Sequence, residues 1–205
     1  MNKVNQKKKK KELPYFPLNV ALLPGEDIPL RIFEPRYKQL IEECHEGGKT
    51  FGIPFISESE MQLYGSEVKI RQVIAKNSKG EMVISVEGVS NFEVESFTDP
   101  VPGKLYSGGK IQTLNLCQPI KNPELIKILI HYSDHMDPSF LKNVKGNEIL
   151  ITDVATALNL SSNDKYRLIS SESDQFREQF LLGQMKYLIK LREQERLLNN
   201  DYYLN

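Results

Sequence analysis

LLPGEDIPLRIFEPRY, residues 22–37, is the stretch that decides the fold, because it predicts a turn, a strand and the start of a helix in succession. Pro24-Gly25 favours a tight turn, since proline fixes φ and glycine tolerates positive φ. From Ile28 to Ile32 apolar residues alternate with other residues, which is the pattern of a half-buried strand. Pro29 cannot donate a backbone hydrogen bond, so we expect this strand to lie at a sheet edge or to be irregular.

A helix is predicted to follow this strand directly. Pro35 suits the first position of a helix, where a backbone N–H has no partner to lose. Four apolar residues then recur at the spacing of one helical face: Tyr37, Leu40, Ile41 and Cys44. Gly47-Gly48 ends the helix. We interpret Glu34 and Arg36 as structural, because an acidic residue at a helix N-terminus can accept its free N–H groups.

Length and composition describe an ordinary globular protein. The chain has 205 residues, 40% of them hydrophobic, which suffices for one large domain or two small ones. Its 27 basic and 27 acidic residues balance, so no overall charge directs it to nucleic acid or to a membrane. No secretory segment and no run of 18 apolar residues is present, so we expect a cytoplasmic protein without a membrane span.

The first residues differ from the rest in charge. Residues 1–13 contain six lysines and one glutamate, without apolar periodicity. We predict a disordered basic tail over 1–13, and a nucleic-acid-binding arm is the alternative.

Two short motifs have the residue types of a metal site and of a nucleotide site. His131 and His135 stand four residues apart near Asp137, but Asp134 replaces the glutamate that zinc peptidases need, so we interpret the segment as a surface turn. Gly48-Lys49-Thr50 follows a helix instead of opening one, unlike a phosphate-binding loop. We therefore expect no metal and no cofactor.

Strand-like patterns extend from Leu13 to about Asn115. Six or seven short strands with turns between them predict a small barrel or sandwich with one helix inserted early. We expect an opening strand within Pro14–Leu23, a loop over Ser57–Leu63 and a hairpin turn at Asn77–Gly80.

The pattern becomes helical after Asn115. Helices are predicted from Pro123, over Ile149–Leu160, after a cap at Ser162-Asn163-Asp164, and from Asp174 to about Asn199. The first half of the last helix is apolar on most sides, so we expect it to be buried and the second half to project outward. The predicted domains are a basic tail (1–13), a β-rich domain (14–118) and a helical subdomain (119–205).

The block from Pro29 to Tyr37 resembles the signature of the N-terminal, substrate-binding domain family of Lon, the ATP-dependent protease La. Weaker matches occur elsewhere in the chain: Phe16-Pro17-Leu18, Leu23-Pro24-Gly25, Phe51-Gly52-Ile53, Glu87-Gly88 and Phe92. The resemblance implies an α+β fold. It consists of a PUA-like β pseudobarrel with one inserted helix, followed by an α-helical subdomain that ends in a long helix.

Two departures from the family pattern bear on activity. Asn91 stands where the family usually has an arginine. The chain also ends at Asn205 without a Walker A motif or the serine–lysine protease domain of full-length Lon. We therefore expect a stand-alone Lon-domain protein that is not an enzyme.

The resemblance implies binding of unfolded or degron-bearing client polypeptides, with a protease or a chaperone as a further partner. The candidate protein-binding residues lie in the last helix and tail: Tyr187, Leu188, Leu191, Leu198, Tyr202 and Tyr203. Closure of the protein's own core or of a dimer interface is the alternative reading of these residues, and the oligomeric state stays open. We interpret the signature residues as structural: Pro24, Gly25, Pro29, Phe33, Glu34, Pro35, Arg36, Tyr37, Gly88 and Phe92.

A second function remains open, because PUA-like barrels can present a groove to RNA or to a small ligand. A basic group surrounds one predicted hairpin: Lys69, Arg71, Lys76 and Lys79. Glu67 and Glu81 dilute its charge, so we rank nucleic-acid binding below protein binding.

Overall fold

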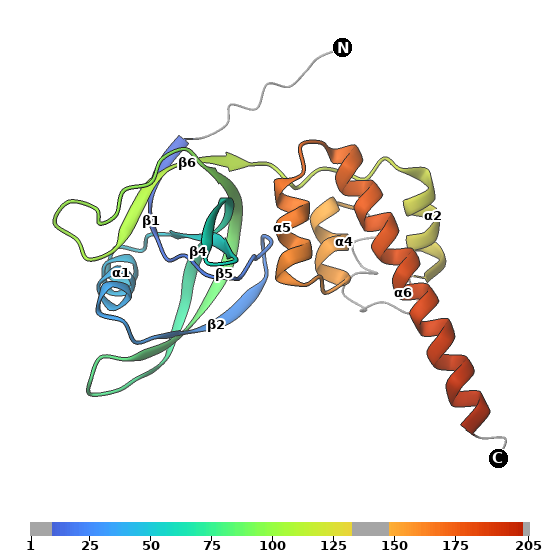
Figure 1. Cartoon of the computed structure of the whole chain (residues 1–205), viewed down its shortest axis with the longest axis horizontal. Helices are drawn as coiled ribbons and strands as arrows, with labels where there is room; N and C mark the ends of the chain where they lie inside the picture. The colour runs from blue at the N-terminus through green and yellow to red at the C-terminus, as the bar shows by residue number, and fades with distance from the viewer. Residues whose placement is uncertain (1–9, 133–147, 203–205) are drawn as a thin grey trace, which may run out of the picture. The chain divides into compact units, whose positions relative to one another are not determined.

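The computed structural model of the chain describes residues 10–132 and 148–202, with side chains as far as residue 196. The described residues form two compact units (Figure 1). One unit contains the chain up to Leu116 together with Ser161–Ser170, and the other contains Cys117–Leu160 and the chain from Ser171 onward.

The first unit is built on a six-stranded sheet. Its strands are β1 (Lys10–Tyr15), β2 (Asp27–Ile32), β3 (Phe51–Ser57), β4 (Glu60–Lys76), β5 (Met82–Val94) and β6 (Ser107–Leu114), and helix α1 (Pro35–Glu46) follows β2. The strand order is β2-β5-β4-β3-β1-β6, and β5 also pairs with β6, so all strands except β2 close into a barrel. β1 and β3 run parallel, and the other pairs are antiparallel.

β2 lies at the edge of this sheet, as Pro29 predicts, because it pairs only with β5. The predicted helix after it and the predicted turn between β4 and β5 are also confirmed. The fold class is therefore confirmed as a β barrel with one inserted helix, followed by helices of which the last is long.

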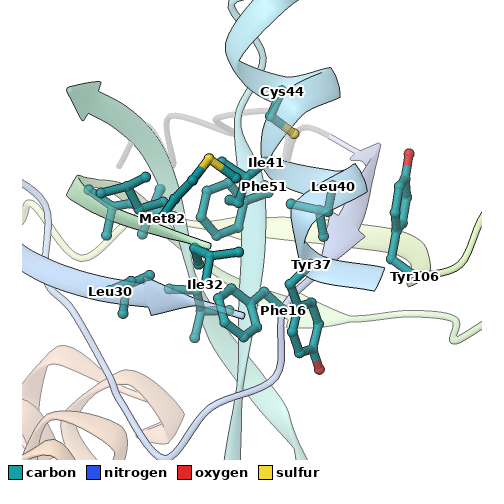
Figure 2. Close-up of a cluster of buried hydrophobic side chains, with 14 of the residues drawn as sticks. Phe16, Leu30, Ile32, Tyr37, Leu40, Ile41, Cys44, Phe51, Met82 and Tyr106 are labelled. Atoms are coloured by element: carbon teal, nitrogen blue, oxygen red, sulfur yellow. The ribbon is translucent and has the colours of Figure 1, made fainter. Parts of the chain in front are cut away.

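The main hydrophobic core joins α1 to the barrel strands (Figure 2). Its labelled members come from the loop after β1, from α1, from the strands β2, β3 and β5, and from the segment before β6: Phe16, Leu30, Ile32, Tyr37, Leu40, Ile41, Cys44, Phe51, Met82 and Tyr106. Each fully buried apolar side chain stabilises the fold by roughly 1.5–3 kcal/mol. The amphipathic pattern of residues 28–44 thus places both the edge strand and the helix.

The start of the chain departs from its prediction. β1 begins at Lys10 and ends at Tyr15, so the predicted tail is wrong for residues 10–13, and the predicted strand within Pro14–Leu23 begins too late. Leu13 is buried and Lys11 forms an ion pair with the buried carboxylate of Glu67, which is why this lysine-rich segment is ordered. Residues 1–9 lie outside the described residues.

The predicted loop at Ser57–Leu63 is also wrong. β3 extends to Ser57 and β4 begins at Glu60, with a tight turn between them. Glu58 and Ser59 adopt the left-handed conformation, with φ of 51° and 68°. Left-handed backbone usually signals glycine, so the sequence carries no mark of this turn.

The helices after the barrel are α2 (Pro123–Tyr132), α4 (Ile151–Ala157), α5 (Ser162–Ser170) and α6 (Asp174–Tyr202). Ser161 caps α5, because its Oγ accepts the backbone N–H of Asp164 at 3.1 Å; the predicted cap, Ser162-Asn163-Asp164, begins one residue late. α5 groups with the barrel unit, where the Tyr166 ring stacks on Phe55 with a centroid separation of 4.6 Å.

Candidate protein-binding surfaces

The turn of the signature stretch is bound tightly to β5. Gly25 has a positive φ of 88°. Its N–H donates to the carbonyl of Gly88 at 2.9 Å, and the N–H of Gly88 donates to the carbonyl of Glu26 at 2.8 Å. A Cβ atom on Gly88 would lie 2.3 Å from the Leu23 carbonyl oxygen. These contacts give Gly25 and Gly88 a role in backbone packing.

The charged pair around Pro35 does not act as predicted. Glu34 occupies the N-cap position of α1, but its side chain makes no capping hydrogen bond. The carboxylate instead accepts Nε and a terminal nitrogen of Arg36, each at 2.9 Å. The Arg36 guanidinium lies 4.6 Å above the Tyr37 ring. The capping prediction is wrong, because Oε2 of this carboxylate pairs with the Arg36 guanidinium and no backbone N–H of the helix is capped by the side chain.

Phe33 stands out among the signature residues, because its side chain is 63% exposed although Ile32 beside it is buried. It borders a pocket of about 220 Å³ between the end of β2 and the β4–β5 hairpin. We call this feature the corner surface; it comprises Phe33 and the other residues that line the pocket: Arg31, Ile32, Ala75, Lys76, Asn77, Glu81, Met82 and Val83. Packing does not explain an exposed aromatic ring at this position.

One signal in the sequence could have identified this surface. Apolar residues at Ile28, Leu30 and Ile32 place one face of the strand inward, so Phe33 falls on the opposite phase. An aromatic residue out of phase with a buried strand face is expected to point outward.

Charged residues of both signs lie in or near the corner surface. Within residues 10–132 and 148–196, Arg31, Lys38 and Lys79 have no ion-pair partner, and the amine of Lys38 donates to the Lys79 carbonyl at 2.9 Å. Lys76 pairs with Glu42 at 2.9 Å. Glu81 also lines the pocket, so its carboxylate offsets the charge of Arg31 and, with Lys76 paired, the lining has no net positive charge.

A larger pocket of about 630 Å³ lies in the same unit, between α1, β1, β6 and the segment that precedes β6. Glu43 lines it and accepts the Lys104 amine at 2.7 Å and the Tyr106 hydroxyl at 2.7 Å. Hydrogen bonds from Lys104 and Tyr106 hold the pKa of Glu43 below its usual value. Burial raises the pKa of the neighbouring Cys44 thiol to about 11, so this thiol stays protonated at neutral pH.

Comparison with known proteins assigns the family. Residues 12–186 match the family model of the ATP-dependent protease La (LON) substrate-binding domain. The chain belongs to this Lon substrate-binding domain family. A Lon protease of Flavobacterium johnsoniae is 25% identical over 181 residues, an alignment that covers 77% of this chain and 22% of that protein. The chain thus spans about a fifth of the length of this relative.

Solved structures show the same fold. A Lon N-terminal domain protein from Xanthomonas campestris matches 84% of this chain and 98% of its own, with a TM-score of 0.62 and 25% identity. The N-terminal domain of a Mycobacterium avium complex Lon protease has a TM-score of 0.56 at 14% identity, over 86% of this chain and 98% of its own.

Asn91, the departure from the Lon family pattern, is buried in the barrel. Its amide nitrogen donates to the Leu22 carbonyl at 2.8 Å and to Ser66 Oγ at 3.2 Å. Asn91 therefore ties the signature loop to β4, and its side chain is not presented to a ligand.

The predicted stripe on α6 is only partly described. Tyr187 is 62% exposed and Leu191 is 38% exposed, whereas Leu188 is half-buried. The side chains of Leu198 and Tyr202 lie beyond the last described side chain, and Tyr203 lies outside the described residues. Phe176 is 73% exposed, so the prediction of a buried first half of this helix is wrong at that position. Its exposure follows from the single face that α6 buries.

The histidine motif falls at the end of α2, where the rings of His131 and Tyr132 meet edge to face at 4.9 Å. His135 and Asp137 lie outside the described residues. Across residues 10–132 and 148–202, no group of three or more His, Cys, Asp or Glu side chains could hold a metal ion. In the same ranges, no helix has both the length and the apolar character needed to cross a membrane.

Proposed function

We propose that this chain is a non-catalytic protein-binding module that recognises unfolded or degron-bearing segments of client proteins. Its role would be to deliver such clients, as an adaptor or chaperone-like factor, to a protease or a chaperone. Membership of the Lon substrate-binding domain family supports this proposal. The observation that carries it is Phe33, an exposed ring in the family signature that the protein's own packing does not use.

The corner surface suits an apolar anchor residue of a client. A pocket of about 220 Å³ beside an exposed ring can shield one bulky side chain from water. Burial of such a side chain contributes roughly 1.5–3 kcal/mol, which is sufficient for weak, reversible binding of many sequences.

Side-chain capture is a better mode here than addition of a strand to the sheet. Pro29 leaves a gap in the donors of β2, the edge strand. β4 lacks a β3 partner beyond Val68, but its register shifts twice in that part, between Ile70 and Gln72 and between Val73 and Ala75. Such bulges bend an edge and impair pairing with another chain.

The stripe on α6 is a second surface in this proposal. Tyr187 and Leu191 lie four residues apart on the helix and are both exposed, which is the spacing with which a helix presents adjacent anchors. Binding of a client there would be independent of the corner surface.

The experiment measures binding of a reduced, carboxymethylated and therefore permanently unfolded test protein by fluorescence anisotropy. Phe33→Ser removes the ring and should weaken binding about tenfold, since loss of an aromatic anchor costs about 1–3 kcal/mol. Leu63→Ser is the matched control, because Leu63 is 61% exposed on β4 but does not line the pocket. Equal affinities for the two variants and the native protein would contradict the proposed site.

The alternative, RNA binding by the basic hairpin, loses support from the ion pairs. Lys69 and Arg71 both pair with Glu87, at 3.1 Å and 2.7 Å, and Lys76 pairs with Glu42. Hydrogen bonding from Lys69 keeps the pKa of Glu87 below its usual value, so this carboxylate stays charged. Two carboxylates thus offset three of the four cations, and Lys79 is the only member of the group without an ion pair in the part of the chain that the structure describes. Paired cations contribute less to phosphate binding than free ones.

A further inference from the structure

The larger pocket of the barrel unit shares no lining residue with the corner surface, so client binding at Phe33 leaves it unused. Its volume of about 630 Å³ lies within the range of roughly 300–1,000 Å³ that is usual for ligand sites. Its walls come from β1, α1, β6 and the segment before β6.

Much of the wall is apolar. Leu13 and Pro14 of β1 face Val101 and Pro102 of the preceding segment, and Tyr106 completes this lining. Phe97 and Leu105, in the same segment, are 48% and 59% exposed although their chain neighbours Ser96, Thr98 and Tyr106 line the pocket. The apolar body of a ligand that lay against this wall would gain free energy by leaving water.

The charged groups of the pocket are not balanced. Lys49 and Lys110 line it together with Glu12 and Glu43, and Glu43 is neutralised by Lys104. Lys104 does not itself line the pocket, but because it pairs with Glu43, the remaining charges of the lining are two lysines and one glutamate, a net charge of one positive unit. Lys49 and Lys110 have no ion-pair partner within residues 10–132 and 148–196, although Glu12 stands opposite Lys110 in the β1–β6 ladder.

We propose that this pocket binds a compact apolar monocarboxylate, and that its occupant is the carboxyl-terminal residue of a client polypeptide. The carboxylate would meet the amines of Lys49 and Lys110, and the last side chain would lie against Pro14, Val101 and Tyr106. In a polypeptide, an apolar residue carries a carboxylate of its own only at the carboxyl terminus. The pocket would therefore distinguish carboxyl-terminal ends from internal segments.

This inference rests on the proposed function for the nature of its ligand, but it uses a different site. The corner surface would bind internal apolar residues of a client, whereas the larger pocket would bind its carboxyl-terminal residue. A protein with both sites would bind clients that end in an apolar residue more tightly than the same clients extended by polar residues.

The experiment uses the full chain and two labelled decapeptides of serine and alanine that end in leucine. One peptide has a free carboxylate and the other is amidated. The free acid should bind about tenfold more tightly than the amide, because a charge-assisted hydrogen bond contributes about that factor. The double variant Lys49→Gln/Lys110→Gln should abolish this preference, and Lys127→Gln, which removes an exposed lysine of α2 that lines neither pocket, should retain it.

Thermal unfolding by circular dichroism verifies that each variant is folded. Equal binding of acid and amide to the native protein, or a preference that survives the double variant, would overturn the proposal. N-acetyl-leucine that bound as tightly as the free-acid peptide would overturn the polypeptide as the occupant. An amidated peptide with an internal phenylalanine tests the corner surface separately, because its binding should depend on Phe33 and not on Lys49.

Discussion

Replacement of Gly88 by alanine tests how the signature stretch is held in place. The added Cβ would lie 2.3 Å from the Leu23 carbonyl oxygen, about 1 Å closer than ordinary contact allows, so the Leu23–Glu26 turn must move away from β5. That movement disrupts the two hydrogen bonds between the turn and Gly88, each worth about 0.5–1.5 kcal/mol. Overpacking adds about 1–3 kcal/mol. We expect Gly88→Ala to lower the free energy of unfolding by about 2–6 kcal/mol.

Urea denaturation followed by tyrosine fluorescence and by far-ultraviolet circular dichroism measures this change, since the chain has nine tyrosines and no tryptophan. Gly183→Ala is the matched control, because a Cβ at this α6 position meets nothing within 4 Å. Alanine has the higher helix propensity, so this variant should be unchanged or more stable by up to about 1 kcal/mol. A Gly88→Ala protein as stable as the native one would refute the claim that backbone packing of this turn requires glycine.

Three further predictions concern buried groups of the barrel unit. Burial alone would raise the pKa of Glu67, but hydrogen bonds from its lysine, serine and threonine partners outweigh this effect and hold the pKa below its ordinary value of 4.5. A carboxylate with a depressed pKa stabilises the fold at pH values above 4.5, so Glu67→Gln should lower the free energy of unfolding by about 1–3 kcal/mol at pH 7. In urea titrations, the difference between the variant and the native protein should vanish as pH falls below 4.5. A difference that did not change with pH would show that the ion pair is not its source. Tyr166→Leu removes the stack on Phe55 and should lower stability by about 0.5–1.5 kcal/mol beyond the loss of buried area, whereas an unchanged melting temperature would show that the stack is dispensable. Iodoacetamide at pH 8 should label the exposed Cys117 and spare Cys44, whose pKa burial raises to about 11; mass spectrometry that found Cys44 labelled at a similar rate would contradict its burial.

The barrel, its edge strand and its inserted helix could be predicted from sequence because their patterns are local. Alternation up to Ile32 and the helical spacing from Tyr37 to Cys44 specify one buried face each, and both faces enter the same core. Pro29 marks the sheet edge for an equally local reason, the absence of a donor.

The start of β1 could not be predicted in this way, because its order depends on a distant partner. Lys11 pairs with Glu67, which is 56 residues away in the chain. A run of lysines has the pattern of a solvated tail. Its order could be predicted only if the buried carboxylate that pairs with one of these lysines were known. The turn at Glu58 and Ser59 was missed because residues other than glycine adopt its left-handed backbone.

Functional residues were harder to separate from structural ones. Membership of a signature made Phe33, Glu34 and Gly88 look alike, but Gly88 is confined by the Leu23 carbonyl, Glu34 pairs with Arg36, and Phe33 is exposed. A family signature shows which residue type recurs at a position, but it does not show whether packing or binding requires that residue. Burial and contact geometry, which the sequence does not contain, supply the reason.

Site-specific photo-crosslinking tests the central claim, client binding at the corner surface, most directly. A p-benzoylphenylalanine placed at Phe33, and the same group placed at Leu63 as the control, would be irradiated with the unfolded test protein, and adducts would be quantified by mass spectrometry. Binding at the corner surface predicts adducts several-fold more abundant from position 33 than from position 63, and competition by unlabelled client. Equal yields from the two positions, or yields that excess client does not reduce, would contradict it.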